Sequence, residues 1–413
     1  MKLIQTQGYR LLTTGVCAPN GFLASGIHCG LRKNKSKKDL SLIYSPVRCN
    51  AAAVYTQNQV KGASIAVTKR HLADGMAQAI IINSGNANTC NDDGEIKAQM
   101  MCDLTAEALQ ISADDVLVAS TGVIGQTLNL APIARNIDQL AMALCDTGND
   151  DAAEGILTLD TCKKEMAIEF TIGEHTCRIG GMAKGSGMVH PNMATILCFI
   201  TTDIAITSTL LHKALSDVVA DTFNMISIDG DTSTNDTCAI LSSGMAKNTL
   251  IQQENSEAYR LFVQALRVVL TNLSRAVARD GEGATKLLEC NVSGAIDIQN
   301  AKRLAKSVIT STLFKCAMFG EDANWGRILC AIGYSQANFN LEKIEIYLCS
   351  QAGTVMVCKD GKGVAFDEQQ ALQILKQPEI QIVIHLQDGD KSAVAWGCDL
   401  SYEYVKRNGD YRK

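Results

Sequence analysis

The sequence has no long apolar run and few prolines. No apolar stretch approaches the roughly 20 residues that a membrane-spanning helix needs, and the first residues, MKLIQTQGYRLL, lack the apolar core of a secretory leader. We therefore expect no membrane role and a cytoplasmic protein. Five prolines among 413 residues and the absence of a long polar linker leave domain boundaries poorly marked.

Strongly basic runs are also scarce. The segment RKNKSKK at residues 32–38 is a short positive cluster that we interpret as a solvated loop. The formal net charge is −5, whereas nucleic-acid binding requires a basic surface. We therefore expect no nucleic-acid partner.

The 16 cysteines form no C-x-x-C pair, and the six histidines are dispersed. Structural zinc sites use ligands that are close in sequence, so we expect no metal. Cys198, Cys238 and Cys330 lie within apolar runs. They are interpreted as small core residues of a protein in a reducing compartment.

Apolar residues make up 46% of the chain, which is enough for a large core in one layered body or in two domains. Strands are predicted at 79–82, 167–172, 195–200, 238–241, 344–348, 354–358 and 380–386, and helices near 92–110, 131–144, 207–223, 256–279 and 299–306. The last strands follow one another without a helix between each pair, which argues against a strict βαβ sheet. The pattern predicts a mixed α and β fold, with changes of organisation near 190–200 and near 285.

A glycine-rich run, GGMAKGSG, occupies residues 180–187. A phosphate-binding P-loop places its lysine directly after the last glycine, followed by serine or threonine. Here Lys184 precedes Gly185, so the run does not fit a P-loop. We interpret it as a flexible loop that allows a close approach and carries one lysine.

The segment HPNMATIL at residues 190–197 follows this run and places Thr195 at the start of a predicted strand. Thr195 can be an ordinary strand-opening residue. It can also be a nucleophile, but a threonine hydroxyl then needs a base. Cleavage between Ala194 and Thr195 would supply one, because the new α-amino group has an ordinary pKa of about 7.7–8.0.

Other loops carry groups that could serve a site. NSGNANTC (83–90) and ASTGVIG (119–125) are either tight turns or sources of backbone N–H groups for an oxyanion. SIDGDTSTND (227–236) lacks the closing glutamate of a calcium loop. Glu282 lies between two glycines in DGEGATK and could face a ligand, whereas GEDANWGR (320–327) could equally be a solvated turn.

Several of these blocks together resemble one family. KGSGMVHPNMATIL is similar to the cleavage-site signature of the ornithine acetyltransferase family, also called the glutamate N-acetyltransferase family, of arginine biosynthesis. NSGNAN, STGVIG, DGDTSTND, DGEGATK, FGEDANWGRIL and WGCDLSYEYV resemble further family blocks in family order between residues 83 and 405, and APNGFLASGI fits near the N-terminus.

The resemblance implies a fold and a processing event. The implied fold is a layered αββα sandwich related to self-processing hydrolases, with a smaller C-terminal α/β domain over about 285–413. The precursor would cut itself between Ala194 and Thr195. Residues 1–194 would form an α chain and residues 195–413 a β chain, and two of each would assemble into a heterotetramer.

The resemblance also implies an activity. The enzyme would transfer acetyl from N-acetyl-L-ornithine to L-glutamate through an acetyl ester on Thr195, in ping-pong order. It would need no cofactor, although acetyl-CoA could be a further acetyl donor. Thr121 and Gly122 match the oxyanion pair, and the matched substrate contacts are Thr161, Lys184, Thr195, Glu282, Asn408 and, at the last position, Lys413.

Two positions depart from the family pattern. Lys413 stands where the family commonly has threonine or serine, which puts that contact in question, and Leu159 stands where threonine is common. Two other functions remain open at this point. One is an aminopeptidase or amidase with the same N-terminal nucleophile, and the other is a non-catalytic amino-acid-binding protein.

Overall fold

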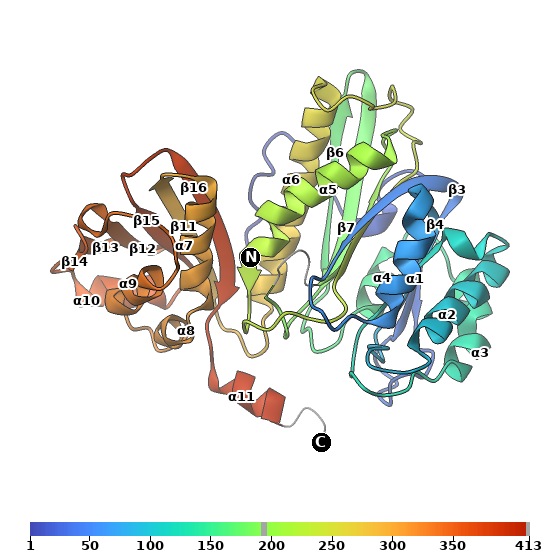
Figure 1. The fold of residues 1–413 in the computed structure, drawn as a ribbon, viewed down its shortest axis with the longest axis horizontal. Coiled ribbons are helices and arrows are strands. Elements are labelled where there is room, and N and C mark those ends of the chain that lie inside the picture. Colours follow the sequence, from blue (N-terminus) through green and yellow to red (C-terminus); the bar gives the residue numbers. More distant parts are fainter. Residues whose placement is uncertain (191–195, 410–413) are drawn as a thin grey trace.

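The computed structural model describes residues 1–190 and 196–409 (Figure 1). Ala194, Thr195 and Lys413 therefore lie outside the described residues. Within them, the chain forms two β-sheets, and the helices pack on their faces.

The first sheet has nine strands in the order β1-β6-β7-β8-β10-β3-β4-β5, with β2 paired to β3. Its strands are β1 (Arg10–Leu12), β2 (Leu23–Ile27), β3 (Leu40–Tyr55), β4 (Met76–Asn83), β5 (Val116–Ser120), β6 (Lys164–Ile172), β7 (His175–Lys184), β8 (Leu197–Thr202) and β10 (Thr237–Ser242).

The long strand β3 turns this one sheet into two layers. Its first part pairs with β2 and β4, and its last part pairs with β10. Between them, the pairing with β4 shifts register between Tyr44 and Cys49. Such irregularities bend a strand and increase its twist, so the two halves of the sheet can face each other.

The inner faces of the two halves share one apolar cluster, which includes Ile82 and Leu117 from one half and Phe199 and Leu241 from the other. Helices cover the outer faces. Helices α5 (Ser208–Asp221) and α6 (Glu257–Arg279) pack on one half, and α1 (Ala63–His71), α2 (Gly94–Leu109) and α3 (Ala131–Met142) pack on the other. Figure 1 shows these two helical layers on opposite flanks of the strands. The result is an αββα sandwich, which confirms the predicted fold class.

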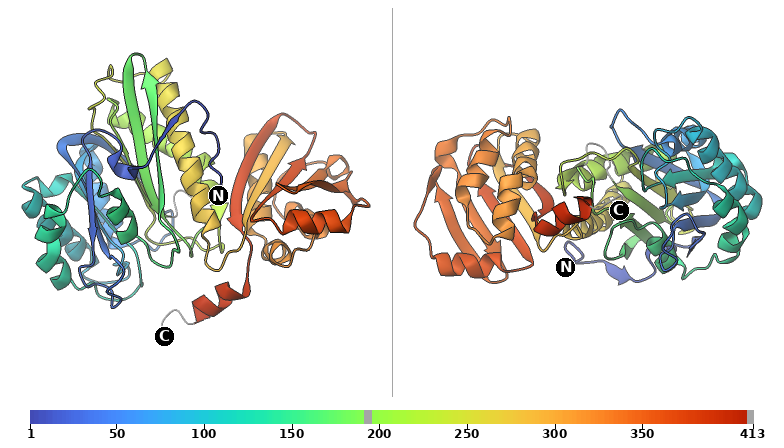
Figure 2. Two further views of the ribbon diagram at one scale, coloured as in Figure 1. Left: turned by 180° about the vertical axis from the view of Figure 1, so that it is seen from behind. Right: turned by 90° about the horizontal axis from the view of Figure 1, so that it is seen from below.

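A second sheet lies beside the sandwich (Figure 2). Its order is β14-β13-β12-β15-β11-β16-β9. The strands are β9 (Ile226–Ser227), β11 (Leu287–Ala295), β12 (Glu345–Ser350), β13 (Gly353–Lys359), β14 (Lys362–Gly363), β15 (Glu379–His385) and β16 (Lys391–Cys398). The remaining helices are α4 (Asn149–Gly155) in the sandwich, and α7 (Ile298–Thr310), α8 (Thr312–Phe319), α9 (Trp325–Gly333), α10 (Glu368–Leu375) and α11 (Tyr402–Gly409) after β11.

Helix α6 joins the two parts of the core. It contacts β6 and β7 in the sandwich and β11 and β16 in the second sheet, and its apolar stripe belongs to one continuous cluster. By length and composition α6 could cross a membrane, but 72% of its most apolar window is buried inside the protein. It is therefore placed as a core helix of the folded body.

The glycine-rich run at 180–187 differs from the prediction. Residues Gly180–Lys184 form the end of strand β7 and are buried, so the interpretation as a flexible loop was wrong for this part. A Cβ at Gly180 would lie 1.9 Å from the carbonyl oxygen of Gly15. The glycine is therefore explained by the close approach of another backbone to the strand, not by mobility.

The strands and helices predicted from periodicity are present, with ends shifted by a few residues. Residue 195 of the predicted strand 195–200 lies outside the described residues. The elements that were not predicted are the short helices α1, α4, α8, α9, α10 and α11 and the strands β1, β2, β3, β5, β7, β9, β11, β14 and β16. Trp325 of GEDANWGR begins α9, where the side chain of Asn324 caps the helix by accepting from the Arg327 N–H.

Candidate active site

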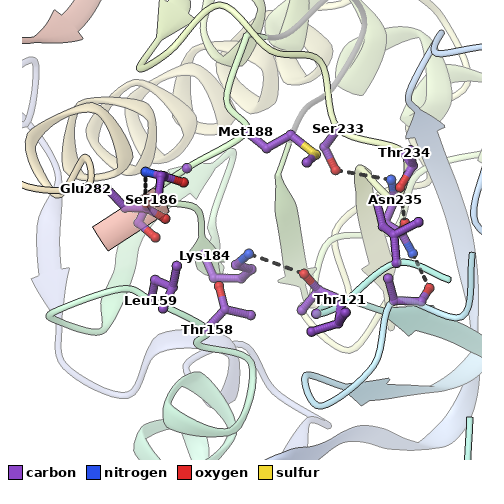
Figure 3. Close-up of a pocket in the computed structure, with 16 residues that line it drawn as sticks. Thr121, Thr158, Leu159, Lys184, Ser186, Met188, Ser233, Thr234, Asn235 and Glu282 are labelled. Atoms are coloured by element: carbon purple, nitrogen blue, oxygen red, sulfur yellow. Dashed lines mark hydrogen bonds between the residues drawn. The ribbon is translucent and has the colours of Figure 1, made fainter. Parts of the chain in front are cut away.

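A cavity of about 300 Å³ lies where the ends of β4, β5 and β7 meet the segment before β10 and the loop after α6 (Figure 3). Its lining is mostly polar side chains and glycines from loops. The lining residues are Ala87, Thr121, Gly122, Val123, Ile124, Thr158, Leu159, Lys184, Ser186, Gly187, Met188, Ser233, Thr234, Asn235, Glu282 and Asn408.

Five of the residues predicted from the sequence line this one cavity: Thr121, Gly122, Lys184, Glu282 and Asn408. They come from three separate segments of the chain and from the last helix, α11. Thr161 does not line the cavity, although its neighbours Thr158 and Leu159 do. Its role in substrate binding therefore stays a prediction, as do those of Thr195 and Lys413, which lie outside the described residues.

The backbone at Thr121 and Gly122 is held in an unusual shape. The Thr121 N–H donates to the Asn83 carbonyl at 2.9 Å. Gly122 has φ of +133°, and a Cβ there would lie 2.8 Å from the backbone nitrogen of Asn86. Only glycine fits both constraints. Among residues 1–190 and 196–409, none accepts a hydrogen bond from the Gly122 N–H, so this donor could serve a ligand.

Lys184 is buried beside Thr121. Its Nζ donates to Thr121 Oγ1 at 3.4 Å. Burial lowers the pKa of Lys184, while the carboxylates of Asp160 and Asp236 act against this shift. Because the Thr121 oxygen accepts from Lys184, the hydroxyl proton of Thr121 remains able to point at an acceptor in the cavity.

A narrow recess of about 20 Å³ continues from this point and is lined by Thr121, Lys184, Asp236 and Ile196, among others. Ile196 is the residue that directly follows Thr195 in the chain. Asp236 is buried, and burial raises its pKa well above the usual range for an aspartate. Its Oδ2 has no hydrogen-bond partner in the described part of the chain.

Glu282 and Asn408 meet at another part of the wall. Asn408 Nδ2 donates to Glu282 Oε2 at 2.7 Å. Burial raises the pKa of Glu282. A side chain at position 187 would displace the Glu282 carboxylate, since a Cβ there would lie 2.4 Å from Glu282 Oε1. The cavity thus holds one buried cation, Lys184, and one buried carboxyl group, Glu282.

Lys164, Asp160 and Asp280 form a buried ionic cluster next to the cavity residues Thr158 and Leu159. Lys164 Nζ lies 2.6 Å from both Asp160 Oδ1 and Asp280 Oδ2. Asp160 also accepts from the Gly185 N–H at 2.9 Å. Burial alone would raise the pKa of Asp160, but Lys164 and Lys184 hold it below its usual range. The hydroxyl of Thr161 donates to Asp280, which explains why Thr161 turns toward this cluster.

Sequence reasoning missed this cluster and the role of residues 233–235. No helical or strand periodicity links Lys164 to Asp280. From the sequence, the acidic string 227–236 is only an incomplete calcium loop and part of a family block. In the structure, Asp229 accepts from the Met188 and Val189 N–H groups at 2.6 and 2.9 Å, and Ser233, Thr234 and Asn235 line the cavity. The described residues contain no group of three or more metal-ligating side chains.

An αββα sandwich with a cavity at the strand ends, lined by Thr121, Lys184 and Glu282, is the architecture of a layered α/β enzyme. The chain belongs to the ArgJ family, which matches residues 23–413.

Named relatives agree over nearly the whole chain. The "Arginine biosynthesis bifunctional protein ArgJ" of Caldanaerobacter subterraneus subsp. tengcongensis is 48% identical and covers 95% of this chain and 97% of its own length. The protein of the same name from Symbiobacterium thermophilum is 47% identical, over 97% of this chain and 99% of its own. The solved structure of argJ from Bacillus halodurans is 42% identical, with a TM-score of 0.49, and covers 52% of this chain and 98% of that chain.

The protein is therefore an acyltransferase of arginine biosynthesis, as the resemblance predicted. Family membership over the whole chain does not favour the two other functions left open by the sequence, an aminopeptidase or amidase and a non-catalytic binding protein.

Proposed function

We propose that the protein transfers the acetyl group of N-acetyl-L-ornithine to L-glutamate through an acetyl ester on Thr195. The observation that carries the proposal is the convergence of Thr121, Gly122, Lys184 and Glu282 on one cavity. Ile196, the residue after the proposed nucleophile, lines the adjoining recess.

The proposed first half-reaction starts with Thr195 Oγ attacking the acetyl carbonyl. The α-amino group of Thr195, freed by cleavage after Ala194, takes the hydroxyl proton. The Thr121 hydroxyl and the Gly122 N–H donate to the tetrahedral oxyanion. The C–N bond then breaks, ornithine leaves with the proton on its α-amino group, and the acetyl group remains on Thr195.

In the second half-reaction, the α-amino group of glutamate attacks the ester. The amine gives a proton to the α-amino group of Thr195, and the same two donors hold the oxyanion. The ester C–O bond then breaks, Thr195 Oγ takes that proton, and N-acetylglutamate leaves. Both amino acids carry an α-carboxylate, and the buried ammonium of Lys184 is the group suited to bind it. Glu282, with Asn408 bonded to it, is suited to the side-chain ammonium of ornithine.

The decisive experiment mixes purified protein with N-acetylornithine and glutamate. Acetyl transfer produces N-acetylglutamate and ornithine in equal amounts. Release of acetate without N-acetylglutamate would instead identify a hydrolase. We also propose acetyl-CoA as a second acetyl donor, because the relatives are named bifunctional proteins. Replacing N-acetylornithine by acetyl-CoA in the same assay tests this.

Self-cleavage is tested by denaturing electrophoresis. Dividing 44.3 kDa in proportion to 194 and 219 residues predicts bands of about 21 and 23 kDa. A Thr195→Ala variant should remain one inactive band of 44.3 kDa. A single intact band from active wild-type protein would contradict the cleavage proposal. Size measurement of the native enzyme tests the proposed heterotetramer of two α and two β chains.

We also propose that the enzyme works in the cytoplasm and without a cofactor. All 16 cysteines are free thiols, ten of them buried, which suits a reducing compartment. Activity that survives exhaustive dialysis against a chelator would support the absence of a metal or dissociable cofactor.

A further inference from the structure

The side chain of Asn235 lies at the point where the two loops that follow β4 and β5 meet. Asn235 belongs to the segment that leads into β10, and it is 5% exposed. Figure 3 shows it at the edge of the cavity next to Thr234 and facing the Thr121 loop.

The amide of Asn235 makes four hydrogen bonds. Its Nδ2 donates to the carbonyls of Ala87 at 2.6 Å and Ser120 at 3.0 Å. Its Oδ1 accepts from the hydroxyls of Thr89 at 2.7 Å and Thr234 at 2.5 Å. A primary amide has two N–H donors and two acceptor positions. All four are used inside the protein, so Asn235 has no hydrogen-bonding capacity left for a substrate, although it lines the cavity.

The bond to Ser120 has a specific consequence. The carbonyl of Ser120 and the N–H of Thr121 belong to the same planar peptide group. Asn235 holds the carbonyl end, and the Asn83 carbonyl accepts from the N–H end at 2.9 Å. The orientation of this peptide is therefore fixed from both sides.

The next N–H along the chain is that of Gly122. Only the two backbone torsions of Thr121 separate it from the fixed peptide. Gly122 itself packs against the backbone of Gly85 and Asn86, within 3 Å of where a Cβ would stand. Asn235 also holds that loop, through Ala87 and Thr89. The side chain of Asn235 therefore binds both loops beside the Gly122 N–H, the loop after β4 and the loop after β5.

We propose that Asn235 is a positioning residue that sets the direction of the Gly122 N–H toward the reacting carbonyl. The proposal rests on the oxyanion role of Gly122 in the proposed function. Hydrogen bonds in an oxyanion site act only when they are pre-aligned, and a displacement of about 1 Å can cost about 100-fold in rate. Asn235 acts through the loop and does not touch the substrate.

Asn235→Asp is the sharpest variant, because it keeps the shape but places an oxygen opposite the Ala87 and Ser120 carbonyls. The kcat of acetyl transfer should fall about 10- to 100-fold. The dissociation constant of ornithine, measured by calorimetry, should change less than about twofold, since Lys184 and Glu282 are held by other contacts.

Asn248→Asp is the matched control. Asn248 is also 5% exposed. It binds backbone groups of Ala205, in the loop after β8, and of Thr249, in the loop after β10, and it does not line the cavity. It should lose stability and retain kcat. An equal loss of kcat in both variants would overturn the proposal.

A second variant reaches Asn235 from outside the cavity. A Cβ at Gly62 would lie 2.4 Å from Asn235 Nδ2, and Gly62 has φ of −62° and ψ of 142°, which alanine adopts without strain. Gly62→Ala should push the amide out of place and lower kcat in the same direction, again without weakening ornithine binding. Wild-type kcat in both Asn235→Asp and Gly62→Ala would overturn the proposal.

Amide hydrogen exchange separates this proposal from the proposed function. Exchange in the peptide that contains residues 121–126 should accelerate in Asn235→Asp and not in Asn248→Asp. If the wild-type enzyme does not transfer acetyl, the proposed function fails. The exchange result then still decides whether Asn235 fixes this loop, and unchanged exchange would overturn the inference.

Discussion

The ammonium of Lys184 donates to the hydroxyl oxygen of Thr121 across 3.4 Å, at the point where the end of β7 meets the loop after β5. This contact joins the group proposed to bind the substrate carboxylate to a group proposed to hold the oxyanion. Substrate recognition and transition-state stabilisation therefore share one buried charge.

Loss of that charge should affect both functions. Lys184→Met should lower kcat/KM for N-acetylornithine about 100- to 1,000-fold, because a buried charged hydrogen bond to a substrate is removed. The measurement is steady-state kinetics at varied N-acetylornithine. Lys163→Met, at an exposed position, is the control and should behave as wild type. A Lys184→Met enzyme within threefold of wild type would rule out both roles.

A Cβ at position 122 should damage the oxyanion site. Gly122→Ala is disfavoured by the φ of +133° and by the backbone of Asn86 at 2.8 Å. Displacement of its N–H should lower kcat about 100- to 1,000-fold, the usual effect of losing one oxyanion donor. Gly125→Ala is the matched control, since Gly125 shares the loop and a positive φ, but nothing lies within 4 Å of where its Cβ would stand. If both alanine variants lose kcat equally, strain in the loop and not the N–H is responsible.

The binding of N-acetylornithine should depend on pH through Glu282. Only the ionised carboxylate attracts the ammonium of the substrate side chain, and burial raises the pKa of this group. KM should therefore fall as pH rises through that raised pKa, above the usual glutamate range, and then become constant.

Glu282→Gln should remove this pH dependence and raise KM about 10- to 100-fold, the value of a charge-assisted hydrogen bond. KM is measured across the pH range in both enzymes. Glu403→Gln, an exposed change on α11, should leave the wild-type profile intact. The same pH dependence in Glu282→Gln would assign the titration to another group.

Removal of Lys164 should destabilise the whole fold. Lys164→Met leaves Asp160 and Asp280 buried without their shared cation, which should lower the free energy of unfolding by about 3–5 kcal/mol. Urea unfolding followed by circular dichroism measures the loss, with Lys163→Met as the neighbouring exposed control.

The pH dependence of the stability that Lys164 contributes follows from the pKa of Asp160. The pKa of this carboxyl group is lowered in the folded state, so its contribution is present above the unfolded-state pKa and is lost as pH falls. The stability difference between wild type and Lys164→Met should therefore shrink in acid. A difference that grows in acid would contradict the ion-cluster assignment.

Local patterns were sufficient for much of the secondary structure. The apolar stripe of α5 and the β-branched runs of β12 and β15 predicted their elements because a 3.6-residue or two-residue period depends only on neighbours along the chain. The loop prediction was wrong for residues 180–184 because adjacent glycines usually mark a loop. Here Gly180 lies in a strand that another backbone approaches closely, and that approach cannot be read from nearby residues.

The site divides in the same way. The family blocks predicted that Thr121, Gly122, Lys184, Glu282 and Asn408 belong to one site, and in the structure all five line one cavity. Asn235 lies in an acidic block that lacks the closing glutamate of a calcium loop and that otherwise served only as a family block. Three of its four partners lie 115 to 148 residues away in the sequence, so no spacing rule could identify them.

The sequence alone determined which reactive groups are available, because a threonine after a small residue, a lysine among glycines and a glycine-flanked glutamate are each properties of short segments. The tertiary structure alone decided how they act together. The bend of β3 folds one sheet into two facing layers, and that folding brings the ends of β4, β5 and β7 to one cavity. Contacts such as those of Asn235, and of Lys164 with Asp280 across 116 residues, exist only once distant segments have packed.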